Sequence, residues 1–384
     1  MKTLDIGLVG SGFMGKGHSV AYQLVPRIFE RLAVRPRLRV LGDVSEELAR
    51  AAAAKLGFEE HVVGWEGVVH HPEVDIVDIT APNHLHREIA VAAAAAGKHI
   101  YCEKPLALSA EDALAMLEAV ERAGVRTMVG FNYLKSPATL AARRLIEEGV
   151  LGEIRHFRGS FHEDILADPA QPFSWRFERA LAGAGALGDL GAHVIAVAHA
   201  LVGDITKVSA MTETFIHERP VASGAYGYDG KANEDAPKRV VENEDVVHFL
   251  AKFAGGATGV IESSRIAAGR KVFLAYEVNG SKGSLAFVHE RMNELELYLS
   301  DDPEGRRGFR TILTGPEHPY YGAFWPVAGC GLGFGDMKVI EIFELLDGIA
   351  HDKPITPDFR DGYRVDKVIA AVLASAASGQ WVEV

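Results

Sequence analysis

Short apolar runs alternate with helix-like segments over the first third of the chain. Residues 4–9, 37–41 and 74–80 are rich in apolar side chains and predict strands. Between two of these strands, Ser45 can cap a helix that Gly57 ends, since a serine oxygen accepts from helix N–H groups and glycine adopts the left-handed C-cap conformation. Parallel strands need such crossover helices, so the alternation predicts an α/β fold with a doubly wound parallel sheet.

The pattern of apolar positions changes near residue 131. Alternating, strand-like segments then follow one another with few helices between them, which is typical of a largely antiparallel sheet. The polar, glycine-rich stretch 222–244 predicts a long loop. We therefore expect an N-terminal domain at 1–131 and a second α/β domain at 132–384, whose C-terminal tail could pack on either domain. The strands predicted for the second domain lie at 153–161, 208–214, 246–253, 259–265, 273–279, 284–288 and 295–299.

The first predicted strand leads into a glycine motif with the spacing G-x-G-x-x-G. Gly10 permits a tight turn, Gly12 lets the backbone approach a pyrophosphate, and Gly15 lets the following helix pack against the strand. The backbone N–H groups of Phe13 and Met14 would then face the pyrophosphate at the helix N-terminus. A glycine triplet alone is weak evidence, but its place between a strand and a helix favours a dinucleotide site.

An acidic residue, Asp43, ends the second predicted strand and could accept hydrogen bonds from both hydroxyls of an adenosine ribose. It lies further from the glycines than the usual separation of about 20 residues, and segment 26–39 is consistent with a lengthened crossover. A turn or helix-capping role is the alternative. An acid here repels a 2′-phosphate and Val44 adds no positive charge, so NAD is expected rather than NADP, with Arg50 on the next helix as the feature that leaves NADP open.

Charge and cysteine usage narrow the class of protein. The chain has 40 Lys and Arg against 52 Asp and Glu, a formal net charge of −12, which argues against nucleic acid or an anionic membrane as a partner. Cys102 and Cys330 cannot form a disulfide framework, which favours a reducing compartment. The chain start leaves no room for a signal peptide, and apolar stretches such as 89–97 are too short to span a bilayer. We expect a cytoplasmic enzyme.

Two further motifs carry polar side chains that could act in catalysis. Cys102-Glu103-Lys104-Pro105 follows a predicted strand, and the segment 183–193 has the spacing G-x-G-x-x-x-D-x-x-x-H. Together with the glycine turn, and in this order and spacing, these motifs resemble those of the Gfo/Idh/MocA oxidoreductase family over nearly the whole chain. Closer matches resemble its levoglucosan dehydrogenase branch, and related branches act on inositols and other sugars. These closer matches lie at 12–19, 82–86, 174–177 and 307–311.

The resemblance implies hydride transfer between a carbinol carbon of a sugar or cyclitol and C4 of nicotinamide. It also implies a Rossmann domain followed by an α/β domain with an open, mainly antiparallel sheet that pairs subunits into homodimers or homotetramers. The favoured activity is oxidation of a levoglucosan-type anhydrosugar to a 3-keto product. The alternatives are an inositol or other sugar dehydrogenase, an NAD-dependent redox glycosidase, and a non-catalytic NAD-binding sensor. Intact Lys104, Asp189 and His193 argue against the sensor.

The matched positions suggest roles for these three residues. His193 could take and return the hydroxyl proton near neutral pH, and Asp189, four residues earlier on the same helix face, could contact that hydroxyl or bias His193 electrostatically. Lys104 lies at the carboxyl end of a strand, where doubly wound sheets bind ligands, and could orient the hydroxyl and stabilise the alkoxide. Without the resemblance, a solvated lysine and a surface Asp–His pair would be the more ordinary interpretations.

Further positions are implied as cofactor or substrate contacts. His86 could equally be a polar residue that starts a helix, and Trp175 could belong to the core. Tyr133 could donate its hydroxyl to sugar oxygens or pack, and Trp325 lies in an aromatic loop that could stack on a sugar or form an interface. No metal is expected, because the histidines form no coherent ligand set and no Cys-x-x-Cys occurs. The cofactor candidates outside the glycine turn and Asp43 are Thr80, Pro82, Asn83, His86, Glu103, Lys104, Trp175 and Arg176.

Overall fold

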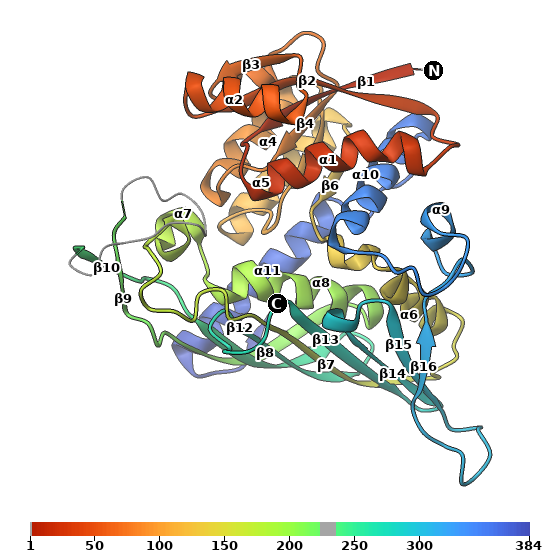
Figure 1. Ribbon diagram of the computed structural model, residues 1–384. Helices are drawn as coiled ribbons and strands as arrows, with labels where there is room; N and C mark the ends of the chain where they lie inside the picture. The colour runs from red at the N-terminus through yellow and green to blue at the C-terminus, as the bar shows by residue number, and fades with distance from the viewer. Residues whose placement is uncertain (1, 223–235) are drawn as a thin grey trace. The chain divides into compact units, whose positions relative to one another are not determined.

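The computed structural model describes residues 2–222 and 236–384 (Figure 1). The chain forms two compact units, each of which combines segments that are distant in sequence. The first unit contains Met1–Asn132 and Phe334–Asp366, and the second contains Tyr133–Gly333 and Lys367–Val384. Residues 223–235 of the predicted loop at 222–244 lie outside the described ranges.

The first unit is built on a six-stranded sheet with the order β3-β2-β1-β4-β5-β6, in which every pairing is parallel. This confirms the doubly wound parallel sheet that the sequence predicts. The strands are β1 Lys2–Val9, β2 Val34–Asp43, β3 Glu60–Val63, β4 Ile76–Ile79, β5 His99–Cys102 and β6 Thr127–Val129. The helices are α1 Phe13–Ile28, α2 Glu46–Leu56, α3 Glu66–Val69, α4 His86–Ala95, α5 Ala110–Ala123 and α10 Phe334–His351, with the short turn η1 Asn83–Leu85.

The ends of α2 follow from local sequence. The Ser45 side chain accepts a hydrogen bond from the backbone N–H of Leu48, and Glu46 and Glu47 occupy the first turn, where the helix dipole favours negative charge. Gly57 ends the helix with φ +85°, a left-handed conformation that suits glycine. The predicted N-cap and C-cap of this helix, Ser45 and Gly57, are therefore confirmed.

The late helix α10 packs on the early helix α1 within the first unit. The rings of Phe29 and Phe343 stack with their centroids 3.9 Å apart, and Phe13 and Phe334 lie 6.4 Å apart. The sequence placed the domain boundary at 131/132 and left open on which domain the C-terminal tail packs, and here Phe334–Asp366 belongs to the first unit. The helix α11, Phe359–Ser378, begins in the first unit and ends in the second.

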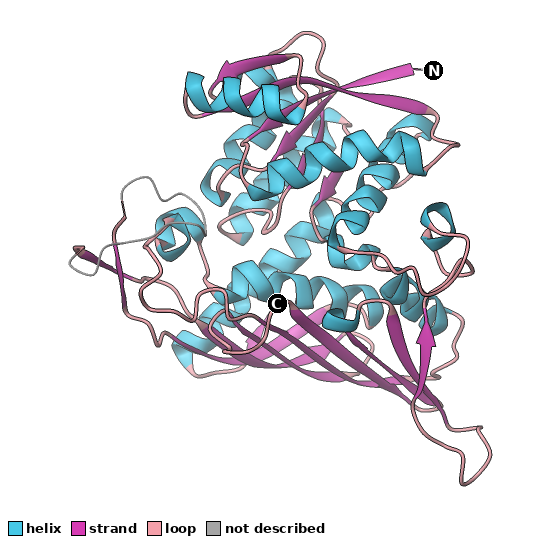
Figure 2. Ribbon diagram, viewed as in Figure 1, coloured by secondary structure: helices cyan, strands magenta, loops and turns pink. Residues whose placement is uncertain are grey.

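The second unit contains a nine-stranded sheet with the order β16-β15-β14-β13-β7-β12-β11-β8-β17 (Figure 2). Its pairings are antiparallel except that of β7 with β12, so the predicted mainly antiparallel sheet is confirmed. The strands are β7 Ile154–His162, β8 Ile205–Glu213, β11 Val246–Phe253, β12 Thr258–Ser264, β13 Phe273–Gly280, β14 Gly283–Val288, β15 Glu294–Leu299, β16 Arg310–Leu313 and β17 Val382–Glu383. A separate ribbon pairs β9 Glu218–Pro220 with β10 Lys238–Val240.

Helices of the second unit cover one face of this sheet. Along β7, Phe157, Gly159 and Phe161 are buried and alternate with exposed or half-buried residues, as expected for a strand with one covered face. The helices and helical turns of the unit are η2 Asn132–Lys135, α6 Pro137–Glu147, η3 Trp175–Phe177, α7 Arg179–Ala182, η4 Leu187–Gly191, α8 Ala192–Leu201, η5 His289–Arg291 and α9 Tyr321–Phe324. Of these, α8 packs against β7, and α6 packs against β14 and β15.

One helical stretch of the second unit, Arg179–Leu201, is long and apolar enough to cross a membrane by length and composition alone, which the sequence analysis did not anticipate. Its most apolar window is 78% buried inside the protein, as in a core helix of a soluble protein, so it is weak evidence for a membrane span.

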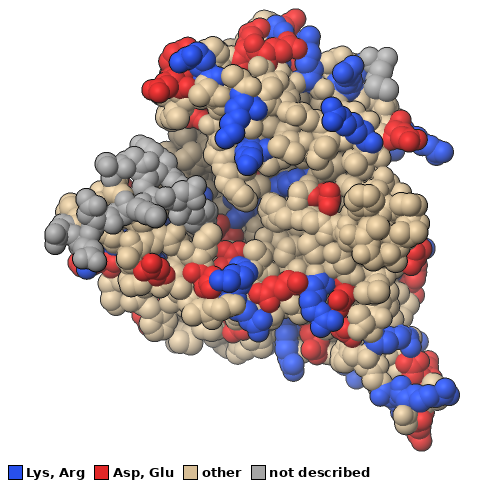
Figure 3. All heavy atoms as spheres, in the orientation of Figure 1, with Lys and Arg blue, Asp and Glu red and all other residues tan. Residues whose placement is uncertain are grey.

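Acidic and basic side chains intermix on the face shown in Figure 3, so the excess of acidic residues forms no single acidic patch on that face.

Candidate active-site segments

The glycine turn has the geometry of a dinucleotide site. Gly10 has φ +93°, and an added Cβ at Gly15 would come within 2.2 Å of the Gly10 carbonyl oxygen. An added Cβ at Gly12 would meet no described atom within 4 Å, so space is open beside the first turn of α1. Within the described chain, no side chain caps this helix. The N–H groups of its first turn, which include those of Phe13 and Met14, are therefore available to a pyrophosphate.

Asp43 is fixed to this turn at the carboxyl end of β2. Its Oδ2 accepts hydrogen bonds from the Ser11 backbone N–H at 2.9 Å and the Ser11 hydroxyl at 2.5 Å, and its Oδ1 accepts from the Val44 N–H at 2.7 Å. The side chain is half-buried. Because β1 and β2 are neighbours, the acid and the glycine turn share one edge of the sheet. The ribose-binding role of Asp43 stays a prediction that this position supports.

The segment after β4 supports the turn. The Thr80 hydroxyl donates to the carbonyl oxygen of Gly10 at 2.6 Å. His86 is fully buried, with Nε2 2.9 Å from the Ala81 oxygen and Nδ1 3.0 Å from the Pro105 oxygen, and burial lowers its pKa. Its imidazole therefore joins the segment after β4 to the segment after β5. Direct cofactor contact by His86 stays a prediction, as it does for the half-buried Pro82–Asn83 segment and Thr80.

Glu103 and Lys104 follow β5 and differ in burial. Glu103 is 6% exposed, and its Oε1 lies 2.9 Å from Nε2 of His18 and 2.7 Å from Nζ of Lys338. Its Oε2 accepts from the backbone N–H of Lys104 at 3.3 Å, and Lys104 itself is half-buried. His18 and Lys338 were not predicted as site residues from the sequence. Only His18 carried a sequence signal, because it lies within the segment 12–19 that resembles the family.

Asp189 and His193 lie on consecutive helical turns of the second unit. Asp189 is in η4, a π-helical turn, and His193 is in the first turn of α8. A wider π-helical turn rotates side chains by less per residue than an α-helix, so a spacing of four residues still keeps both on one side. Asp189 is half-buried and His193 is 5% exposed.

A buried acid, Glu244, holds the glycine-rich start of this helix. Its Oε1 accepts hydrogen bonds from the N–H groups of Gly185 at 2.7 Å and Leu187 at 3.0 Å. Its carbonyl oxygen accepts from the Ala186 N–H at 2.9 Å, and burial raises the pKa of its carboxyl group. The next residue, Asp245, pairs with the buried Arg265 at 2.9 Å. From the sequence, Glu244 was expected at the end of the loop 222–244, and no role was predicted for it.

Three rings pack around that of Tyr133. Its ring meets those of His193, His289 and Phe161 edge to face, with centroids 4.7, 4.8 and 5.4 Å apart. Tyr133 is 7% exposed, which favours the packing interpretation, while its substrate contact stays a prediction. Burial lowers the pKa of His289 to about 4, so this imidazole is neutral at pH 7. His193 therefore packs beside the rings of Tyr133 and Phe161.

Three other candidates lie elsewhere in the second unit. Trp175 and Arg176 are half-buried in η3, with the Arg176 guanidinium 4.6 Å from the centroid of the Trp175 ring. Trp325 follows α9 and is 44% exposed, so its ring is accessible on this unit. Their proposed contacts with cofactor or sugar stay predictions.

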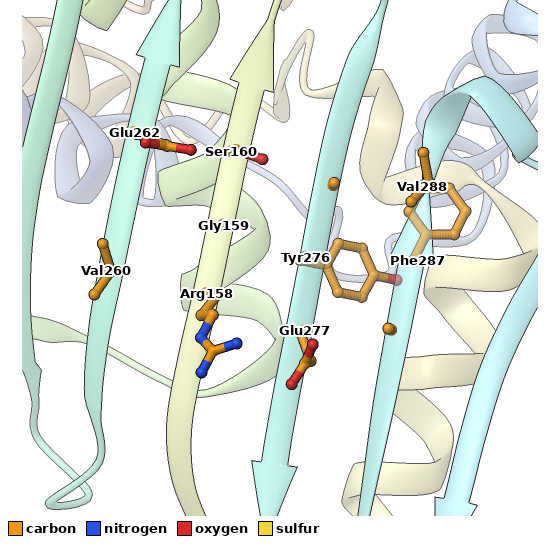
Figure 4. A pocket seen from close by; sticks show the side chains of 11 residues that line it. Arg158, Gly159, Ser160, Val260, Glu262, Tyr276, Glu277, Phe287 and Val288 are labelled. Atoms are coloured by element: carbon orange, nitrogen blue, oxygen red, sulfur yellow. The ribbon is translucent and has the colours of Figure 1, made fainter. Parts of the chain in front are cut away.

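A hollow of about 350 Å³ lies on the opposite, open face of the nine-stranded sheet. Figure 4 shows that its lining residues come from β7, β12, β13 and β14, with Arg158 and Glu277 near one another. The residues that line it include none of the predicted catalytic or cofactor contacts. Among residues 2–222 and 236–384, no group of three or more His, Cys, Asp or Glu is arranged to hold a metal ion.

Two family models match the chain. The model described as "Oxidoreductase family, NAD-binding Rossmann fold" matches residues 4–131, and the "GFO/IDH/MocA C-terminal domain" matches residues 139–286. The chain belongs to the Gfo/Idh/MocA oxidoreductase family. As a member of this family it is an NAD-dependent dehydrogenase, and the glycine turn, the first turn of α1 and Asp43 fit that cofactor.

The proteins that this chain resembles include sugar and inositol dehydrogenases. A levoglucosan dehydrogenase of Pseudarthrobacter phenanthrenivorans is 44% identical over 385 residues, which cover 100% of this chain and 99% of the relative. A myo-inositol 2-dehydrogenase of Thermotoga maritima is 27% identical and covers 80% of this chain and 81% of its own. A solved levoglucosan dehydrogenase in complex with NADH has a TM-score of 0.95 at 43% identity, covering 100% and 99% of the two chains.

Proposed function

We propose that this dehydrogenase oxidises a secondary hydroxyl of a levoglucosan-type anhydrosugar to a ketone. The observation that carries the proposal is the full-length identity of 44% to a levoglucosan dehydrogenase, together with the intact Lys104, Asp189 and His193. A structure of a levoglucosan dehydrogenase with NADH and levoglucosan, with a TM-score of 0.94, supports the same substrate class.

The first unit would hold the cofactor. The N–H groups at the start of α1 would bind the pyrophosphate, and Asp43 would accept from the adenosine ribose. NAD supplies a hydride acceptor at C4 of its nicotinamide. Because the Asp43 carboxylate sits beside the turn, a 2′-phosphate would meet like charge there, which favours NAD over NADP.

Three side chains would act on the sugar. His193 would accept the proton of the reacting hydroxyl, and Lys104 would orient that hydroxyl and stabilise the developing oxyanion. Asp189 would contact the hydroxyl or favour the protonated form of His193. In this reaction the O–H proton would go to His193, the hydrogen of the C–H bond would leave with its electron pair as hydride to C4 of nicotinamide, and a C=O bond would form.

A substrate panel tests the proposal. Purified protein is mixed with NAD or NADP and with levoglucosan, myo-inositol, glucose or galactose, and absorbance of the reduced nicotinamide is followed. We expect the highest kcat/KM with levoglucosan and NAD. A clear preference for myo-inositol would replace the substrate assignment, and glycoside cleavage without net NADH would replace the reaction with that of a redox glycosidase.

We also propose that the open face of the nine-stranded sheet joins two copies of this chain. Met211, Leu250 and Val260 are exposed at 61%, 48% and 40% on adjacent strands of this face. Such a row of apolar side chains is costly to leave in water. Light scattering after size exclusion should give a dimer or tetramer, and Leu250→Glu should lower the oligomeric state. A monomeric wild type would contradict this proposal.

A cytoplasmic location is a further proposal. Cys102 and Cys330 are both free cysteines, and such thiols persist in a reducing compartment. Cell fractionation with an antibody to the protein tests the assignment, and recovery in the secreted fraction would contradict it.

A further inference from the structure

Six buried polar side chains of the first unit form one connected network. They come from α1, β4, β5, the residue after β5, and α10, and each is 6% exposed or less. One member of the network, Glu103, directly precedes Lys104 in the chain. Its members are His18, Asp78, Tyr101, Glu103, Lys338 and Glu341.

His18 bridges two carboxylates. Its Nδ1 lies 2.9 Å from Oδ1 of Asp78, and its Nε2 lies 2.9 Å from Oε1 of Glu103. An ionised carboxylate oxygen only accepts hydrogen bonds, so with both carboxyl groups ionised each ring nitrogen carries a proton. The geometry therefore favours an imidazolium at His18, and the ring also stacks on Tyr101 with the centroids 4.5 Å apart.

Lys338 is the second cation of the network. Its Nζ donates to Oε1 of Glu103 at 2.7 Å, to Oε2 of Glu341 at 2.9 Å and to the Tyr101 hydroxyl at 3.1 Å. These three acceptors match the three donors of an ammonium group. Lys338 is 1% exposed, so its charge depends on these partners rather than on water.

Opposite charges in the network outweigh the cost of burying them. Burial and the charge of Lys338 lower the pKa of His18, but Asp78 and Glu103 outweigh them and raise that pKa above its usual value. Burial alone would raise the pKa of Glu103, but Lys338 and His18 hold it well below the usual range. Asp78, Glu103, Lys338 and Tyr101 are the titratable groups around His18, with Tyr22 beside Asp78. Burial raises the pKa of Glu341.

The result is a Glu103 carboxylate with little freedom to rotate. Both cations bind its Oε1, its Oε2 faces the N–H of Lys104, and Gly130 approaches from the remaining side. A Cβ at Gly130 would come within 2.7 Å of Oε1, so any larger residue there would displace the carboxylate. The backbone of Lys104 is thus tied to a carboxylate that two buried cations fix.

We propose that His18, as a buried imidazolium, and Lys338 are positioning residues that fix the Glu103–Lys104 segment for cofactor binding and catalysis. Neither side chain is proposed to touch substrate. The inference rests on the proposed function for the role of Lys104, whereas its structural part concerns the first unit alone. A network that serves only folding is the competing explanation, so the test needs measurements that folding alone would not move.

Nitrogen NMR of histidine-labelled wild-type protein without substrate tests the first part. We expect both ring nitrogens of His18 to remain mostly protonated at pH 6.5, where an ordinary histidine is half deprotonated, and His18→Asn identifies the signal. A His18 ring that is mostly neutral at pH 6.5 would overturn the proposal whatever sugar the enzyme oxidises, so this result is separate from failure of the proposed function.

Variants test the positioning role. His18→Asn keeps an amide that can donate to Asp78 but removes the contact with Glu103, and Lys338→Met removes the second cation. Loss of one partner of a buried charge pair is strongly unfavourable, and we expect NADH, measured by equilibrium fluorescence titration, to bind about 5- to 20-fold more weakly. We also expect kcat to fall about 10- to 100-fold with little change in the KM of the sugar.

Two further variants keep the test decisive. Lys98→Met is the matched control, because the Lys98 ammonium binds only the backbone oxygens of His71 and Val74 among the contacts described, and it should leave NADH affinity and kcat unchanged. Lys338→Arg restores a cation and should recover part of both losses. Folded His18→Asn and Lys338→Met proteins with wild-type NADH affinity and kcat would overturn the positioning role. If Lys338→Met does not fold, the comparison of His18→Asn and Lys338→Arg with wild type decides it.

Discussion

The two units support their candidate catalytic segments with different chemistry. In the first unit, Glu103 is held by the charged side chains of His18 and Lys338. In the second, the buried Glu244 holds the start of the η4–α8 segment through the backbone N–H groups of Gly185 and Leu187. The first support depends on which groups carry protons, and the second depends on the path of the backbone. The two halves should therefore respond differently to pH and to isosteric substitution.

Gly185 shows why the second support is a backbone device. An added Cβ there would lie 2.1 Å from the carbonyl oxygen of Glu244, so the chain can approach this closely only at a glycine. By contrast, Glu103 is held by the side chains of His18 in α1 and Lys338 in α10, and no glycine is needed for these side chains to reach it.

Removal of the proposed catalytic groups should have the largest effect. Lys104→Ala in the first unit and His193→Ala in the second should each lower kcat about 10²- to 10⁴-fold, the range for positioned acid–base and electrostatic groups. NAD binding should be largely retained, as measured by fluorescence titration beside initial rates. Either variant with weakened NAD binding but normal turnover at saturating NAD would contradict these roles.

Changes at Glu244 should have an intermediate effect that separates the two supports. Glu244→Ala removes the acceptor of two buried N–H groups, which costs about 1–3 kcal/mol for each unsatisfied group, and should lower both kcat and the melting temperature. Glu244→Gln keeps one acceptor oxygen, so its kcat and melting temperature should fall much less than those of Glu244→Ala. NADH affinity, which depends mainly on the glycine turn and Asp43 of the first unit, should change little in either variant. Equal losses in both variants would show that charge, rather than acceptor geometry, matters at Glu244.

The pH dependence of stability should show the smallest effect. The folded-state pKa of His18 is raised above 6.5, so its contribution is fully present below that value and is lost as the pH rises through the folded pKa. The difference in melting temperature between wild type and His18→Asn should therefore be larger at pH 6 than at pH 9. A difference in melting temperature that is larger at pH 9 than at pH 6 would contradict the assignment of His18 as a buried cation.

Local signals account for the parts of the molecule that the sequence predicts well. The glycine turn and the ends of α2 were predictable because Gly10, Gly15, Ser45 and Gly57 make their decisive contacts within the turn or helix they define, or with the adjacent strand. The alternation of strands and helices likewise predicts the first sheet, and the succession of strands with few helices between them predicts the second, since each strand keeps its pattern of buried residues whatever its partner.

Long-range pairings account for what the sequence could not provide. His18 and Glu103 lie 85 positions apart and Glu103 and Lys338 lie 235 apart, so no spacing rule relates them. The return of α10 to the first unit depends on ring contacts with α1, such as Phe29 with Phe343, that a single sequence does not reveal. Glu244 was missed because its polar, glycine-rich neighbourhood is typical of an exposed loop.

The open space at Gly12 separates what the fold requires of this residue from what a bound nucleotide would require of it. A methyl group there meets no described atom within 4 Å, and the residue has φ −64°, which alanine also adopts. The empty protein would thus tolerate Gly12→Ala, and unfolding experiments would barely register it. Only a bound dinucleotide would detect the added carbon, so the identity of this position is dictated by the nucleotide and not by the polypeptide.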